Sequence, residues 1–145
     1  MRWVAVTALV LVLGASLAIS YLVYRQLDTK TVTITDTAQL QPNGAGALCG
    51  SLSFSLDPRT LGRWLFPIKV GQQVSGDVTV DGSEAEDIGV RVWSPSNRLL
   101  LNRPVPQHSQ QFQLVAPARG DYLFEFDNRH SALTAKRITI ALCLA

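Results

Sequence analysis

Apolar side chains recur at every second position through most of the chain after residue 47, and this alternation restricts the fold more than any other sequence feature. A period of two places alternate side chains on opposite faces of a β-strand, so each stretch offers one face to a core. About eight short strands separated by Pro, Gly, Asn and Asp turns are typical of a sandwich or small barrel. We predict an all-β fold, an antiparallel, jelly-roll-like β-sandwich, over residues 47–145. The apolar sets are Leu52, Phe54 and Leu56; Val74, Val78 and Val80; Ile88, Val90 and Val92; Phe112 and Leu114; Tyr122, Phe124 and Phe126; and Ile138, Ile140 and Leu142.

Two shorter stretches extend this pattern. Residues 31–35 alternate in a way that fits a short strand or an extended linker, so we expect residues 25–46 to form a juxtamembrane linker with a possible first strand. The consecutive leucines 99–101 form a short apolar run, which favours a buried strand.

The chain has two cysteines, one near each end of the predicted sandwich. Cys49 and Cys143 both fall off the apolar phase of their strands, so they can meet if the first and last strands are neighbours. We expect a disulfide between them, which implies an oxidising compartment.

The chain begins with a segment of membrane-spanning length, with no charged residue or proline from Trp3 to Tyr24. A cleavable signal peptide has a similar composition, but cleavage after Ala18 or Ser20 would leave an apolar mature start. We therefore expect residues 1–24 to remain as a transmembrane signal-anchor helix of a single-pass protein. The expected disulfide orients it, with Met1 cytoplasmic and the domain extracytoplasmic, in the periplasm or at the cell surface. Gly14 and Ala18 give the helix a small face suited to packing on another transmembrane helix.

The charge pattern excludes a nucleic-acid-binding surface. The formal net charge is only +2, and the arginines are mostly scattered singly among acidic residues. Phosphate recognition needs clustered positive charge, so we expect no nucleic-acid partner.

A run from Gly120 to Asn128, followed by Ser131, Lys136 and a final strand, resembles the closing hairpin of GOLD (Golgi dynamics) domains. The elements that carry the resemblance are Gly120, Tyr122, Phe124, Phe126, Asp127, Asn128, Ser131 and Lys136. The upstream segments 71–76 and 87–92 also fall where that family places its middle strands.

The resemblance implies a β-sandwich that binds proteins or membrane-associated ligands and does not catalyse a reaction. The chain departs from the cargo receptors of that family, because its anchor is N-terminal and its C-terminus carries no basic sorting tail. A bacterial-type GOLD-like domain at a cell envelope fits these departures better.

No catalytic, cofactor or metal site is expected. The acidic stretch 81–87 offers hard oxygen ligands but lacks the spacing of a calcium loop, and a solvated turn explains it better. His108 and His130 each precede a serine, but adjacent side chains in an extended chain point to opposite faces and cannot form a nucleophile and base pair.

The candidate contact residues are aromatic or basic. Trp93 and Arg91 share the face opposite the apolar set of their strand, and Trp64 lies on a Pro67-containing stretch that suits an edge strand. The leading hypothesis is an interaction module bound to the lipid bilayer, an accessory subunit of a membrane protein complex. The alternative is a glycan- or lipid-binding sandwich at the envelope. Exposure of Trp64 and Trp93 in a shallow groove would favour that alternative, whereas flat apolar edges would favour a protein partner.

Overall fold

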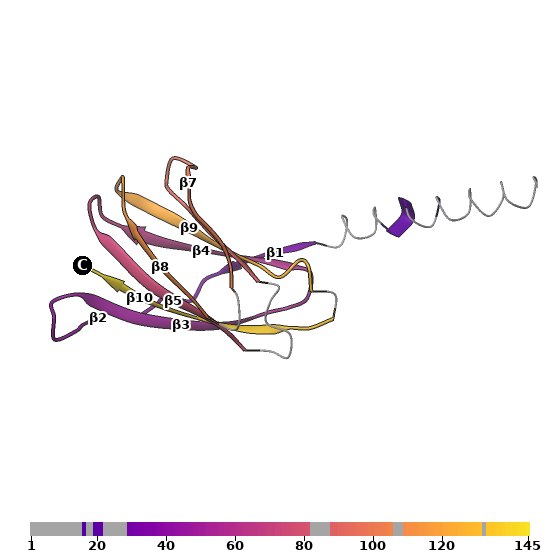
Figure 1. Ribbon diagram of the computed structural model, residues 1–145, viewed down its shortest axis with the longest axis horizontal. Helices are drawn as coiled ribbons and strands as arrows, with labels where there is room; N and C mark the ends of the chain where they lie inside the picture. The colour runs from indigo at the N-terminus through magenta and orange to yellow at the C-terminus, as the bar shows by residue number, and fades with distance from the viewer. Residues whose placement is uncertain (1–15, 17–18, 22–28, 82–87, 106–108, 132) are drawn as a thin grey trace, which may run out of the picture.

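The chain forms two β-sheets packed face to face (Figure 1) in a computed structural model that describes residues 16, 19–21, 29–81, 88–105, 109–131 and 133–145. The β9 sheet has five strands in the order β1-β4-β9-β6-β7, and the β10 sheet has five in the order β2-β3-β10-β5-β8. The strands are β1 (Lys30–Ile34), β2 (Gln41–Pro42), β3 (Leu48–Leu56), β4 (Thr60–Ile68), β5 (Gln73–Asp81), β6 (Gly89–Trp93), β7 (Leu99–Pro104), β8 (Ser109–Val115), β9 (Gly120–Asp127) and β10 (Lys136–Leu144).

The predicted all-β sandwich is confirmed, with ten strands in the described residues instead of about eight. Every strand pair is antiparallel except β1 with β4, which run parallel. Both β1 and β2 lie in the segment 25–46, for which a linker with a possible first strand was expected, and both pair with strands of the sandwich.

The core lies between the two sheets and follows the predicted alternation. The central strand β9 contributes Tyr122, Phe124 and Phe126, and the central strand β10 contributes Ile138 and Ile140; all five are fully buried. Burying large aromatic and branched side chains of this kind stabilises a domain by about 1.5–3 kcal/mol each.

The predicted disulfide is confirmed. Cys49 on β3 and Cys143 on β10 are directly opposite in the strand register, with their Cα atoms 4.1 Å apart and a bond between the two sulfurs. Both side chains are half-buried on the outer face of the β10 sheet.

No helix within the described part of the chain is long and apolar enough to cross a membrane. Gly14 and Ala18, with most of residues 1–24, lie outside the described residues, as do the stretch 82–87 and His108.

Two sequence expectations about exposure are wrong. Trp64 is only 2% exposed, because it shares the inward phase of β4 with Phe66 and packs against that ring and Phe124 at centroid distances of 4.9 and 5.4 Å. It therefore offers no exposed aromatic face to a partner. The leucine run forms β7, an edge strand, so Leu99 is 41% exposed instead of buried.

Candidate functional site

The outer face of the β9 sheet carries two cross-strand rows of side chains. The strand register places Arg63 of β4 opposite Glu125 of β9, and Glu125 opposite Arg91 of β6. One step along the strands, a second row contains Leu65, Leu123, Trp93 and Leu99. Side chains opposite each other in neighbouring strands interact directly, so these two rows lie side by side as a polar and an apolar stripe.

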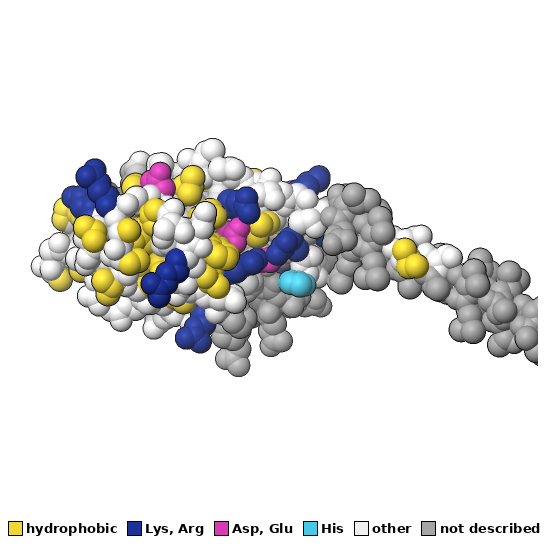
Figure 2. Space-filling view, turned by 90° about the horizontal axis from the view of Figure 1, so that it is seen from above, with side chains coloured by type: hydrophobic (Ala, Val, Ile, Leu, Met, Phe, Trp, Pro, Cys, Tyr) yellow, Lys and Arg dark blue, Asp and Glu magenta, His cyan; other side chains and the backbone are white. Residues whose placement is uncertain are grey.

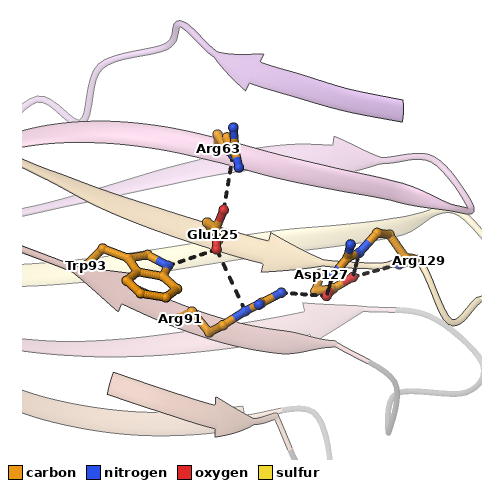
Figure 3. A network of polar contacts seen from close by, with 6 residues as sticks. All are labelled: Arg63, Arg91, Trp93, Glu125, Asp127 and Arg129. Atoms are coloured by element: carbon orange, nitrogen blue, oxygen red, sulfur yellow. Dashed lines mark hydrogen bonds and ion pairs between the residues drawn. The ribbon is translucent and has the colours of Figure 1, made fainter. Parts of the chain in front are cut away.

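The polar row centres on Glu125, whose side chain is only 6% exposed (Figure 3). Arg63 donates from Nε to its Oε1 at 3.1 Å, and the Trp93 indole N–H donates to Oε2 at 2.8 Å. Arg91 lies 3.8 Å from the same Oε2 through its Nε. These contacts fix the orientation of both arginines and of the indole ring.

Asp127 forms the second centre of the network, also visible in Figure 3, with its side chain 8% exposed. Arg91 contacts its Oδ2 from Nη2 at 2.7 Å, so this guanidinium bridges both carboxylates. Arg129 donates from Nη2 to Oδ2 at 2.6 Å and from Nε to Oδ1 at 2.8 Å. Such paired contacts between a guanidinium and a carboxylate are stronger than neutral hydrogen bonds.

The network also shifts the pKa values of two of its members, Asp127 and Arg129. Burial raises the pKa of Asp127, but the hydrogen bonds from Arg129 and the charges of Arg129 and Arg91 outweigh burial and hold that pKa below its ordinary value. The hydrogen bond to Asp127 raises the pKa of Arg129. Both groups are therefore charged at neutral pH.

Acid should weaken the fold partly through Asp127. A carboxyl group whose pKa is lower in the folded state stabilises the fold above its unfolded pKa of about 3.9, and loses this contribution as the pH falls through the folded pKa. We expect the free energy of unfolding to fall less steeply below about pH 4 in Asp127→Asn than in the parent protein. Urea unfolding at stepwise pH values measures this, with Asp121→Asn as the control from an exposed position of the same strand. Equal slopes in the parent and Asp127→Asn would contradict the expectation.

The apolar row is exposed at its two ends. Leu65 is 55% and Leu99 is 41% exposed, while Leu123 and Trp93 between them are half-buried. Figure 2 looks onto the sandwich from above and shows hydrophobic atoms gathered in the middle of this face with basic side chains around them. Leu65 also lines a largely apolar cavity of about 330 Å³ at the end of β4, together with Thr37, Ala38, Leu40, Trp64, Phe66 and Pro67.

The residues of the predicted hairpin motif act mainly within the fold. Gly120 has a φ of +149°, and a Cβ there would lie 2.8 Å from Cγ of Pro95. The Tyr122 hydroxyl donates to the carbonyl of Ala118 at 2.7 Å. Phe124 and Phe126 fill the core, Lys136 is buried, and Ser131 donates to the carbonyl of Thr134 at 3.0 Å. Asn128 is fully buried, and its amide Nδ2 lies within hydrogen-bonding distance of three carbonyl oxygens.

A separate open groove of about 600 Å³ lies on the β10 sheet. It is lined by Ser75, Gly76, Asp77, Gln111, Phe112, Gln113, Ala141 and Cys143. Four of its eight lining residues, Ser75, Asp77, Gln111 and Gln113, have polar side chains, which distinguishes it from the apolar row on the opposite sheet.

The remaining candidates bring no further groups together. His130 is exposed in the turn after β9, and Asp81 is exposed at the end of β5. Among the residues that the structure describes, no group of three or more His, Cys, Asp or Glu side chains could hold a metal ion.

Sequence reasoning placed Arg91 and Trp93 on the outer face correctly and missed Arg63, Glu125, Arg129, Leu65 and Leu99. The alternation of β9 contains a partial signal, since Glu125 and Asp127 fall in the phase opposite to the inward-facing Tyr122, Phe124 and Phe126. Two of their basic neighbours, Arg63 and Arg91, come from β4 and β6, and the alternation cannot assign these strands as neighbours of β9.

Comparisons with known proteins agree with this architecture. The family model described as emp24/gp25L/p24 family/GOLD matches residues 51–144. A solved periplasmic inhibitor of g-type lysozyme from Aeromonas hydrophila is 20% identical, with a TM-score of 0.54 over 81% of this chain and 98% of that chain. The corresponding Salmonella Typhimurium inhibitor is 17% identical, with a TM-score of 0.49 over 80% of this chain and 98% of that chain. The first similarity shows a shared fold alone, and no curated protein matches the chain significantly.

Proposed function

This chain belongs to the emp24/gp25L/p24 (GOLD) family, and from that membership we propose that it is a non-catalytic interaction module that binds another protein through the outer face of the β9 sheet. The observation that carries the proposal is the exposed apolar row beside a hydrogen-bonded arginine–carboxylate network. Large apolar side chains that gather on one face of a small domain commonly mark a protein interface.

The network makes this face suitable for binding because it holds its arginines in place before a partner arrives. Ordering a long side chain at an interface costs about 0.5–1.5 kcal/mol, and this cost falls when the side chain is already fixed. Arg91 is fixed by contacts to both Glu125 and Asp127, and Trp93 by its hydrogen bond to Glu125. Tryptophan and arginine are also the residue types that most often dominate the binding energy of interfaces.

The burial of Trp64 and Trp93 favours a protein partner over a glycan or lipid ligand. Trp64 is buried, and Trp93 is half-buried in a row between Leu123 and Leu99. One observation supports the alternative ligand class, namely the polar groove on the β10 sheet, whose amides and hydroxyls could hydrogen-bond a glycan.

The proposal includes a place for the domain in the cell. The uncharged segment 3–24 has the length of a membrane anchor, and the disulfide fits an oxidising compartment. We place the sandwich outside the cytoplasm of a bacterial cell, as an accessory single-pass subunit of a membrane complex.

Affinity isolation of the intact protein from its native membranes, followed by mass spectrometry, tests this proposal. We expect Leu65→Ser combined with Leu99→Ser to lower recovery of the partner about tenfold, because both replacements remove apolar contact area. Val115→Ser is the matched control, since Val115 is 62% exposed on β8 of the other sheet.

Two outcomes would contradict the proposed face. Equal recovery of the same proteins by the leucine variant and the Val115→Ser control would exclude it. Loss of recovery only after Gln111→Ala and Gln113→Ala would assign binding to the groove on the β10 sheet instead.

A further inference from the structure

The arginines of the outer-face network are accessible, whereas its carboxylates are covered. The side chains of Glu125 and Asp127 are 6% and 8% exposed, but those of Arg63 and Arg129 are 47% and 39% exposed. Arg91 is intermediate at 26%. An approaching molecule therefore meets guanidinium groups first, with the acidic groups beneath them.

The network also has more positive than negative charge. Three guanidinium groups share two carboxylates, which leaves one positive charge without a counter-charge inside the network. Within the described residues, Arg63 contacts Glu125 only through Nε, so its two Nη groups remain as donors. A guanidinium with two free N–H groups in one plane matches the two oxygens of a carboxylate.

The apolar row lies directly beside Arg63. Arg63 and Leu65 lie two residues apart on the same face of β4, a separation of about 7 Å along a strand. A partner that covers both must carry a carboxylate and an apolar side chain at a similar separation. An extended segment with an acidic and an apolar residue two positions apart meets this requirement.

We infer that the protein partner of this face is acidic there, placing a carboxylate against Arg63 and an apolar side chain against the row from Leu65 to Leu99. This inference rests on the proposed protein-binding function and specifies its chemistry. A phosphate-rich surface is less suitable, because the network has only one surplus positive charge and two carboxylates close beneath it.

Site-specific photo-crosslinking of the full-length protein in its native membranes tests this inference. A benzophenone amino acid replaces Leu99, where it leaves Arg63 and Leu65 unchanged, and in a control chain it replaces Val115. We expect a protein adduct at position 99 and none at position 115. Leu99 lies three strands across from the register of Leu65, and Arg63 is two residues further along β4, so the two positions are about 16 Å apart. Peptide mapping should therefore find Asp or Glu about five residues from the attachment point.

The requirement for the positive charge of Arg63 is tested in the chain that carries the benzophenone amino acid at position 99. We expect Arg63→Gln to lower the adduct yield about fivefold, and Arg63→Glu combined with replacement of the mapped carboxylate by arginine to restore it. Raising KCl from about 50 to about 500 mM should lower the yield in the chain with Arg63 and leave it nearly constant in Arg63→Gln. Arg137→Gln, at an exposed position on β10, is the control for removing one positive charge. The salt dependence of the chain that keeps Arg63 is measured without the Arg63→Gln variant, so it tests the inference even if Arg63→Gln folds poorly.

The outcomes separate the two proposals. A protein adduct that persists in Arg63→Gln and at high salt, on a segment without Asp or Glu, would overturn the acidic partner and leave the binding face intact. An adduct of lipid mass would overturn it in favour of a membrane surface. Equal adduct yields at positions 99 and 115 would overturn the binding face itself.

Discussion

Replacing Cys143 with serine is expected to lower the free energy of unfolding by about 4–5 kcal/mol. The disulfide joins residues 94 positions apart, and closing a loop of that length removes much of the conformational freedom of the unfolded chain. Stabilities of small domains are about 5–15 kcal/mol, so this one bond accounts for a large share of the total. Urea denaturation of the detergent-solubilised protein, with and without a reductant, measures the change.

The reductant provides the internal control for this prediction. Reduced parent protein and Cys143→Ser should unfold at the same urea concentration, and the reductant should have no effect on Cys49→Ser combined with Cys143→Ser. Because both cysteines are half-buried, serine hydroxyls at these positions remain close to water and add little cost of their own. A difference below about 1 kcal/mol between oxidised parent and Cys143→Ser would refute the prediction.

The alternation of side chains predicted the faces of the strands well because it depends only on local geometry. In β9 it separated Tyr122, Phe124 and Phe126 from Glu125 and Asp127, and the structure buries the first set in the core. The same reasoning placed both cysteines off the apolar phase, which made their pairing predictable.

The alternation could not predict the outer-face network, because the network depends on the order of strands in the sheet. Glu125 contacts Arg63, which lies 62 residues away along the chain, and Trp93, which lies 32 residues away. These contacts require β9 to lie between β4 and β6, an order that no local pattern specifies. A charged side chain on an outer face is usually solvated, so its sequence position alone does not indicate a cross-strand partner.

Trp64 shows how a local signal can be misread. Pro67 suggested an edge strand, and Trp64 was therefore a candidate contact residue. In the structure Trp64 shares the inward phase of β4 with Phe66 and Ile68, and Pro67 lies at an unpaired edge. β1 covers β4 only as far as Trp64, so Pro67 lies on the part of β4 that has β9 as its single neighbour. Pro67 indicated that this part of β4 lies at a sheet edge, but it did not indicate whether the Trp64 side chain faces the core or the solvent.

Asn128 provides the second large stability prediction, because its amide joins three segments of the chain at the end of the sandwich. Nδ2 lies within hydrogen-bonding distance of the carbonyls of Leu56, Asp57 and Thr134, at 3.2, 2.9 and 3.2 Å. The first carbonyl belongs to the last residue of β3, the second to the residue after it, and the third to the connection between β9 and β10. The side chain is fully buried, so water cannot replace the amide if it is removed.

We expect Asn128→Ala to lower the free energy of unfolding by about 1–3 kcal/mol, since it leaves the buried carbonyl of Leu56 without this donor, whereas Asp57 and Thr134 lie nearer to water. Asn128→Asp should be worse, because a carboxylate has no N–H and would place negative charge among three carbonyl oxygens. Asn102→Ala, at an exposed position on β7, is the matched control and should change stability by less than about 0.5 kcal/mol. Urea unfolding ranks the three variants.

Since Oδ1 of Asn128 has no hydrogen-bond partner in the described structure, the donors alone account for this ranking. Equal stabilities for Asn128→Ala and Asn102→Ala would show that the three carbonyls find other donors, and that the asparagine of the hairpin motif does not hold these segments together.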